Sequence, residues 1–160
     1  MNKLSASLSL AALAAGFIAS AAQAQTTVKD PWARATVAQQ KASGAFMQLQ
    51  SVKGGKLLSA SSPVAGVVEI HEMAMDGNVM KMRAVPSLDL PAGKAVDLKP
   101  GGYHVMLMDL KKQLNSGDTI PITLVVESAG QREAVEVKAA VRPLSSPGAS
   151  GDKGHHGHKH

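Results

Sequence analysis

Residues 118–141 read DTIPITLVVESAGQREAVEVKAAV, and this stretch decides the fold class. Residues 133–138, EAVEVK, come closest in this chain to an alternation of polar and apolar residues, as in a β-strand with one buried and one solvated face. Ala129-Gly130 is a turn signal that separates this run from the apolar run before it. The stretch therefore predicts two strands with a turn between them.

The same pattern extends over residues 27–142. Turn signals such as Gly54-Gly55, Asp76-Gly77-Asn78 and Pro100-Gly101-Gly102 separate short apolar or alternating runs, and no window keeps a helical apolar period for three turns. We therefore predict a single all-β domain, an antiparallel β-sandwich or Greek-key barrel, with Trp32 as a buried core anchor. The runs expected to form strands are TVKD, ARATV, GAFMQLQSV, KLLSASSPV, GVVEIHEM, NVMKMRAV, KAVDL, YHVMLMDL, DTIPITLVVES and REAVEVKAAV.

Residues 1–24 have the layout of a secretory signal peptide. MNKLSASLSLAALAAGFIASAAQA has a lysine near its start, an apolar middle and the small-residue ending Ala22-Gln23-Ala24. The apolar run is too short for a membrane anchor, so we expect cleavage after Ala24, export to the periplasm and no membrane span. The chain has no cysteine, which excludes disulfides and any site that needs a thiolate.

The C-terminal residues have a different composition. Past Arg142 the sequence reads PLSSPGASGDKGHHGHKH, which is too poor in large apolar residues to form a core. We predict a β domain over residues 25–143 and a flexible tail over residues 144–160. The tail is a candidate metal tract suited to Cu(II), and the alternative is a tag remnant or passive tail. Its candidate ligands are His155, His156, His158 and His160.

Composition argues against several functions. The formal net charge is +5, but the basic residues are scattered and only one Trp and one Tyr could stack on bases, so nucleic-acid binding is not expected. An electron-transfer blue-copper site needs a cysteine thiolate, which the chain lacks. An enzyme is not expected either, because His71 and His104, the only histidines before the tail, both lie in His-x-Met sequences.

Histidine and methionine concentrate in residues 71–82, HEMAMDGNVMKM, and 102–108, GYHVMLM. Residues two apart in a strand share a face, and a sandwich can bring separate strands side by side. A single strand methionine is usually a core filler, as we expect for Met47, but six of the seven methionines beyond the signal peptide lie within residues 71–108. The rows expected to share a face are His71, Met73 and Met75; Met80 and Met82; and His104, Met106 and Met108.

The donor types in these rows favour one metal. Thioether sulfur is soft and imidazole is borderline, a combination that suits Cu(I) better than Mg²⁺, Ca²⁺ or Mn²⁺, whereas zinc more commonly recruits cysteine or carboxylate with histidine. Thioethers also cannot form disulfides in an oxidising compartment. The pattern therefore predicts an exported copper site.

The sequence also resembles the periplasmic copper chaperone PCu(A)C family. The metal motif of that family is a His, ten residues, a Met, twenty-one residues and then His-x-Met, and His71, Met82, His104 and Met106 stand at this spacing. One departure is QLQS at 48–51, where the family would have an asparagine closing the strand. Further similarity lies in DPWARAT (30–36), VEIHEMAMDGNVMKMR (68–83), LPAGKAVDLKPGGYHVML (90–107) and SGDTIPITLVVESAG (116–130).

The resemblance implies a cupredoxin-like barrel that binds Cu(I) through these four residues and delivers it during assembly of the copper centres of cytochrome c oxidase. The expected partner is an apo copper-site protein of a respiratory oxidase or another copper chaperone, and we expect a monomer. A passive copper buffer or resistance protein is the alternative.

The residues around the motif carry further expectations. Packing is favoured for Met80 and Met108, while Met73 and Met75 are either packing or a transient landing surface for copper. By strand alternation, Tyr103 and Glu72 should face away from the metal row, with Glu72 in solvent.

Overall fold

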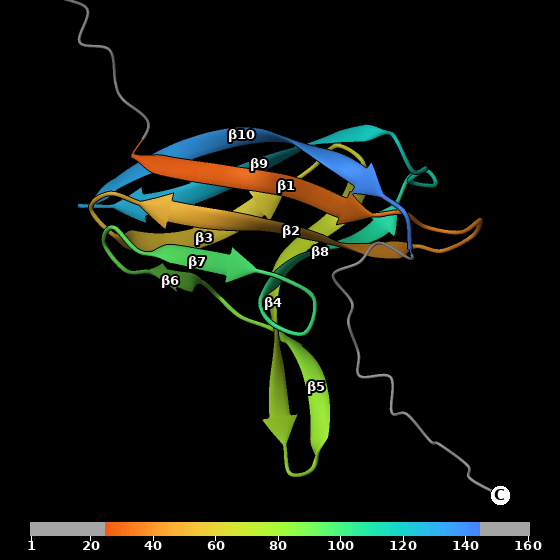
Figure 1. The fold of residues 1–160 in the computed structure, drawn as a ribbon, viewed down its shortest axis with the longest axis horizontal. Helices are drawn as coiled ribbons and strands as arrows, with labels where there is room; N and C mark the ends of the chain where they lie inside the picture. The colour runs from red at the N-terminus through yellow and green to blue at the C-terminus, as the bar shows by residue number, and fades with distance from the viewer. Residues whose placement is uncertain (1–24, 145–160) are drawn as a thin grey trace, which may run out of the picture.

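The computed structural model describes residues 25–144, which form one strongly curved ten-stranded sheet (Figure 1). This part of the chain holds no helix long and apolar enough to cross a membrane. The expected signal peptide and the tail from residue 145 on, with its four histidines, lie outside the described residues. The strands are β1 (Thr26–Arg34), β2 (Ala42–Ser51), β3 (Gly55–Ser61), β4 (Ala65–Asp76), β5 (Val79–Ala84), β6 (Leu88–Leu90), β7 (Ala95–Leu98), β8 (His104–Leu110), β9 (Thr119–Ser128) and β10 (Gln131–Arg142).

The sheet curls into a flattened barrel with a cupredoxin-like, all-β fold, as the sequence predicts (Figure 1). Its hydrogen-bonded order is β5-β4-β8-β2-β1-β10-β9-β3-β6, and β7 pairs with β2 beside β8. The expectation of a wholly antiparallel sheet is wrong at one place, because β1 and β10 pair in parallel. These strands come from opposite ends of the domain, so no tight turn forces them to be antiparallel.

The hairpin that decides the fold class forms as expected. β9 and β10 pair without interruption from Ser128↔Gln131 to Thr119↔Ala140. Ala129 and Gly130 connect them with φ of 50° and 74°, the two positive values that a type I′ turn requires. The turn matches the right-handed twist of the strands, which allows this long pairing.

Two strand expectations are corrected. The run TVKD and the first two residues of ARATV join into β1, because Asp30 adopts a positive φ of 47° and the pairing with β2 shifts register between Lys29 and Trp32. Such a bulge keeps one strand continuous through a kink. β6 was not expected, since a strand of three residues is too short to show a period.

The core is aliphatic and follows from strand alternation. In β2 the inward residues Ala45, Met47 and Leu49 are buried, which confirms the prediction for Met47. Ala33 of β1 is also fully buried and faces the same core. Leucine, isoleucine and valine from the other strands fill the remaining space, and among the described residues this core cluster contains no aromatic side chain.

Trp32 is therefore not the core anchor that the sequence suggested. It is half-buried on the outer face of the barrel, because its neighbour Ala33 takes the inward position. Its ring lies 4.5 Å from the Phe46 ring, centroid to centroid, and the guanidinium carbon of Arg142 lies 5.1 Å from its centre. These aromatic residues cover the outside of β1 and β2.

The β4–β5 hairpin projects from the barrel (Figure 1). β4 pairs with β8 only as far as His71↔His104, and beyond that rung it pairs with β5 alone. Every residue of β5 is exposed. We call residues 72–84 the projecting hairpin; its base adjoins the end of β8.

Candidate metal centre

Strand register brings the three histidine and methionine rows together. His71 lies opposite His104 across β4 and β8, while Met73 lies opposite Met82 across β4 and β5. Directly opposite residues of an antiparallel pair point to the same face. The expected adjacency of the rows is thus confirmed, and they lie on the outer face of the sheet where the projecting hairpin leaves the barrel.

His104 presents one ring nitrogen to the site. It is buried, and its Nδ1 donates a hydrogen bond to the Gly102 carbonyl at 3.0 Å. This contact places the proton on Nδ1 and leaves a lone pair on Nε2. Nε2 lies 3.2 Å from Sδ of Met82, which also offers only lone pairs. Two atoms that face each other with only lone pairs are suited to bind the same cation.

Burial also keeps His104 in its neutral form. Desolvation lowers its pKa below the usual value, and the charges of His71 and Arg34 lower it further, although the hydrogen bond to the Gly102 carbonyl acts in the opposite direction. A lowered pKa means that the imidazole stays neutral to a lower pH than an exposed histidine does. The neutral ring is the form that binds metals.

His71 has one nitrogen engaged and one without a partner. Its Nε2 lies 2.7 Å from Oε2 of Glu69 and donates to that carboxylate, since a carboxylate can only accept. Its Nδ1 is buried and has no hydrogen-bond partner among the described residues. A buried acceptor without a partner is costly, and a metal ion would satisfy it. The ring centre lies 5.7 Å from that of His104.

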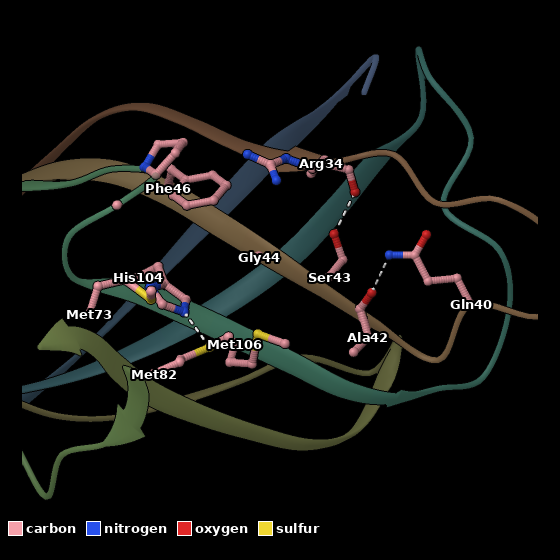
Figure 2. Close-up of a pocket in the computed structure, with 12 residues that line it drawn as sticks. Arg34, Gln40, Ala42, Ser43, Gly44, Phe46, Met73, Met82, His104 and Met106 are labelled. Carbon is pink, nitrogen blue, oxygen red and sulfur yellow. Dashed lines mark hydrogen bonds between the residues drawn. The ribbon is translucent and has the colours of Figure 1, made fainter. Parts of the chain in front are cut away.

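Three methionines gather around the His104 ring (Figure 2). Met73, Met82 and Met106 line one open pocket with His104, and its volume is about 260 Å³. His71 does not line this pocket but adjoins it through the His104 ring. The structure therefore brings all four motif residues to one place, and their binding of a metal remains a prediction.

Gly44 and Phe46 of β2 also line the pocket. Gly44 pairs with Met106, and a Cβ at Gly44 would come 2.8 Å from Cζ of the Phe46 ring. The absence of a side chain allows the ring to lie there. The centroid of the same ring is 6.2 Å from that of His104, so Phe46 also supports the ligand side of the pocket.

The outer methionines differ from what the sequence suggested. Met80 is 47% exposed and Met75 is 62% exposed, so the packing prediction for Met80 is wrong. The reason is that β5 ends the sheet and nothing covers its face. Met108 lies on β8, which has β4 and β2 as neighbours, and it is half-buried, as a packing role requires.

Glu72 faces away from the metal row but not into solvent. Its side chain is only 18% exposed, because it pairs with Arg83 across the hairpin at 2.7 Å. Tyr103 lies on this side as well, as predicted, and burial followed by a hydrogen bond to Glu72 raises its pKa. Strand alternation correctly predicted the face to which Glu72 points. It could not predict that Glu72 is shielded from solvent, because the residues that shield it come from other strands.

Sequence reasoning missed Arg34, Gly44, Phe46 and Glu69. Glu69 could have been found, since it stands two residues before His71 and therefore shares its face. The others come from β1 and β2 and approach only through tertiary pairing. Within residues 25–144, no three His, Cys, Asp or Glu side chains form a cluster that could hold a metal.

Comparison with known proteins agrees with this geometry. A family model described as putative lipoprotein LpqE-like matches residues 26–141. The chain belongs to the LpqE-like family. This LpqE-like chain is 38% identical over 125 residues to the uncharacterized protein RP573 of Rickettsia prowazekii. The matched region covers 74% of the chain and 68% of the relative.

Two solved structures extend the comparison. The copper-bound PCuAC domain from PmoF2 is similar with a TM-score of 0.61 and 25% identity, covering 75% of the LpqE-like chain and 94% of that domain. The solution structure of CuI-DR1885 from Deinococcus radiodurans is similar with a TM-score of 0.57 and 32% identity, covering 76% and 83%. The resemblance to PCu(A)C proteins that the sequence indicated is thereby confirmed.

Proposed function

We propose that this protein is an exported copper chaperone that holds Cu(I) with two histidines and two methionines. The observation that carries the proposal is the 3.2 Å approach of His104 Nε2 to Met82 Sδ, with no hydrogen between them once Nδ1 is the protonated nitrogen. The unpartnered buried Nδ1 of His71 supports it. The proposed ligands are His71, Met82, His104 and Met106.

The donor set explains the choice of oxidation state. Two thioethers and two neutral imidazoles are soft or borderline and carry no charge, so they favour Cu(I) over harder ions. Similar PCuAC structures are described as copper-bound and as holding CuI, which supports the same assignment here.

Anaerobic titration of the protein with Cu(I) tests this function. The protein without its first 24 residues should take up one tightly held Cu(I), and a chain that ends at Leu144 should take up the same amount. Absence of Cu(I) binding by the shortened chain, when its circular dichroism shows a folded β protein, would overturn the assignment.

Delivery is the second part of the proposal. Met82 is about half exposed, and the pocket opens to solvent, so a bound ion would be reachable by another protein. We propose that the recipient is an apo copper-site protein of cytochrome c oxidase or another copper chaperone. Incubating the Cu(I)-loaded protein with an apo-oxidase domain should transfer the ion. Retention of copper would instead favour a passive buffer.

The histidine-rich tail is proposed, from sequence alone, as a separate Cu(II) site. Imidazole must be neutral to bind, and its unperturbed pKa is about 6.5, so binding should weaken between about pH 7.5 and about pH 5.5. Truncation after Ser150 removes all four tail histidines. If the truncated chain keeps its full Cu(II) capacity, the tail has no part in binding.

A further inference from the structure

Arg34 lies in the same pocket as the proposed copper ligands. It lines the pocket together with His104, Met82 and Met106, and Figure 2 shows its guanidinium near the Phe46 ring, across Gly44 from Met106. The guanidinium carbon is 5.7 Å from the centre of the Phe46 ring. The backbone of Arg34 is fixed at this point, because the Ser43 hydroxyl donates to its carbonyl at 2.6 Å.

Arg34 differs from the other arginines in its charged neighbours. The chain has four arginines, and three of them pair with carboxylates: Arg83 with Glu72, Arg132 with Glu127 and Arg142 with Asp30. Arg34 has no carboxylate within salt-bridge distance among the described residues. A half-buried guanidinium without an anion keeps most of its capacity to bind one.

Copper loading would leave the pocket still more positive. The four proposed ligands are neutral and do not offset the charge of Cu(I), and the carboxylate of Glu69, which accepts a hydrogen bond from His71, can offset only one of the two positive charges. The added positive charge of Arg34 therefore makes the loaded pocket attractive to an anion. The planar guanidinium matches a carboxylate through two parallel hydrogen bonds.

We propose that Arg34 binds a carboxylate of the molecule that exchanges Cu(I) with this pocket, and so holds that molecule beside the ion. The inference rests on the proposed function, but it concerns the rate of transfer rather than the ability to bind copper. An anchored ligand attacks the ion at a high local concentration, so exchange becomes faster without a change in affinity.

Two small Cu(I) chelators separate this effect from general access to the ion. Bicinchoninate carries two carboxylates, whereas neocuproine is neutral, and both bind Cu(I) through two aromatic nitrogens. In Arg34→Gln, removal of Cu(I) by bicinchoninate should slow about tenfold, the loss expected for one charge-assisted contact. Removal by neocuproine and the Cu(I) affinity should each stay within about twofold of the parent values.

Arg83→Gln is the matched control. It removes the same charge from a residue that pairs with Glu72 on the opposite face of the projecting hairpin. It should leave both transfer rates unchanged. Arg34→Lys keeps the charge without the planar fork and should give an intermediate rate with bicinchoninate. Added salt should slow the bicinchoninate reaction of the parent more than that of Arg34→Gln.

The outcomes distinguish the two proposals. A parent protein that binds no Cu(I) overturns the proposed function and this inference with it. If Cu(I) is bound normally but Arg34→Gln transfers it at the parent rate, the inference alone is wrong. Equal slowing with both chelators, equal slowing in Arg83→Gln, or loss of Cu(I) affinity in Arg34→Gln would also overturn it.

Discussion

The barrel and the projecting hairpin use the same residue type in opposite ways. Met47 in β2 and Met75 in β4 each stand in an alternating strand, yet Met47 is 3% exposed and Met75 is 62% exposed. β2 has neighbours on both sides and a second layer over its inner face, whereas the hairpin end of β4 has only β5 beside it. Alternation thus decides which residues share a face, and the layers decide whether that face is covered.

The difference in cover has an energetic consequence. Barrel residues gain free energy from apolar burial, at about 25 cal/mol per Å². The hairpin instead has cross-strand ion pairs, the exposed pair of Lys81 with Asp76 and the half-exposed pair of Arg83 with Glu72, and ion pairs at a protein surface contribute only about 0–1 kcal/mol. Stability should therefore reside in the barrel, while the hairpin can be specialised for binding.

Leu107→Ala should have the largest effect of the changes considered. Leu107 of β8 is fully buried, so the cavity should lower the free energy of unfolding by about 2–5 kcal/mol. The matched change Met80→Ala on the hairpin should cost less than about 0.5 kcal/mol. Urea unfolding of both variants measures the contrast. Similar losses of unfolding free energy in the two variants would show that the hairpin contributes to the core, contrary to the difference drawn between it and the barrel.

Met82→Leu should separate binding from stability. Leucine keeps the size and apolarity of the half-exposed side chain but removes the sulfur that faces His104. We expect Cu(I) affinity to fall by more than about 100-fold, since even the loss of a residue that only supports a ligand costs about 10–100-fold. Unfolding should change by less than about 0.5 kcal/mol. Parent affinity in this variant would assign Met82 to packing.

Glu69→Gln should have a smaller effect on the same site. The carboxylate accepts a hydrogen bond from Nε2 of His71 and so orients the ring and strengthens Nδ1 as a donor. An amide keeps the shape but not the charge, and we expect Cu(I) affinity to fall about tenfold. Competition with a chelator measures this change. Glu136→Gln makes the same change at an exposed position in the middle of β10, so it serves as the control and should match the parent.

Met75→Leu and Met80→Leu should have the smallest effect. These residues lie opposite each other two paired positions beyond Met73 and Met82, outside the pocket that His104 lines. Removing both sulfurs should change Cu(I) affinity by less than about twofold, because neither residue reaches the proposed ligands. A larger loss of Cu(I) affinity in the chelator competition would show that the copper site extends from the pocket along the hairpin.

Sequence reasoning succeeded where the physical cause is local. The strand pattern of β10 and the turn at Ala129-Gly130 depend on neighbouring residues, and both appear as predicted. The motif spacing indicated His71, Met82, His104 and Met106, which the structure brings to one place. The errors arose where a residue's surroundings come from distant strands, as for Trp32, Met80 and the cover of Glu72.

The sequence by itself determined which face of a strand each side chain takes and where the turns lie. It also determined that the chain is rich in methionine thioethers and has no cysteine thiol. Those properties depend on the backbone period of two and on the residues that tolerate a positive φ. Only the tertiary structure decided that β4 adjoins β8, that Phe46 and Arg34 complete the pocket, and that the hairpin lacks cover. Strand order depends on how the whole sheet buries its apolar face, and no short stretch of residues contains that information.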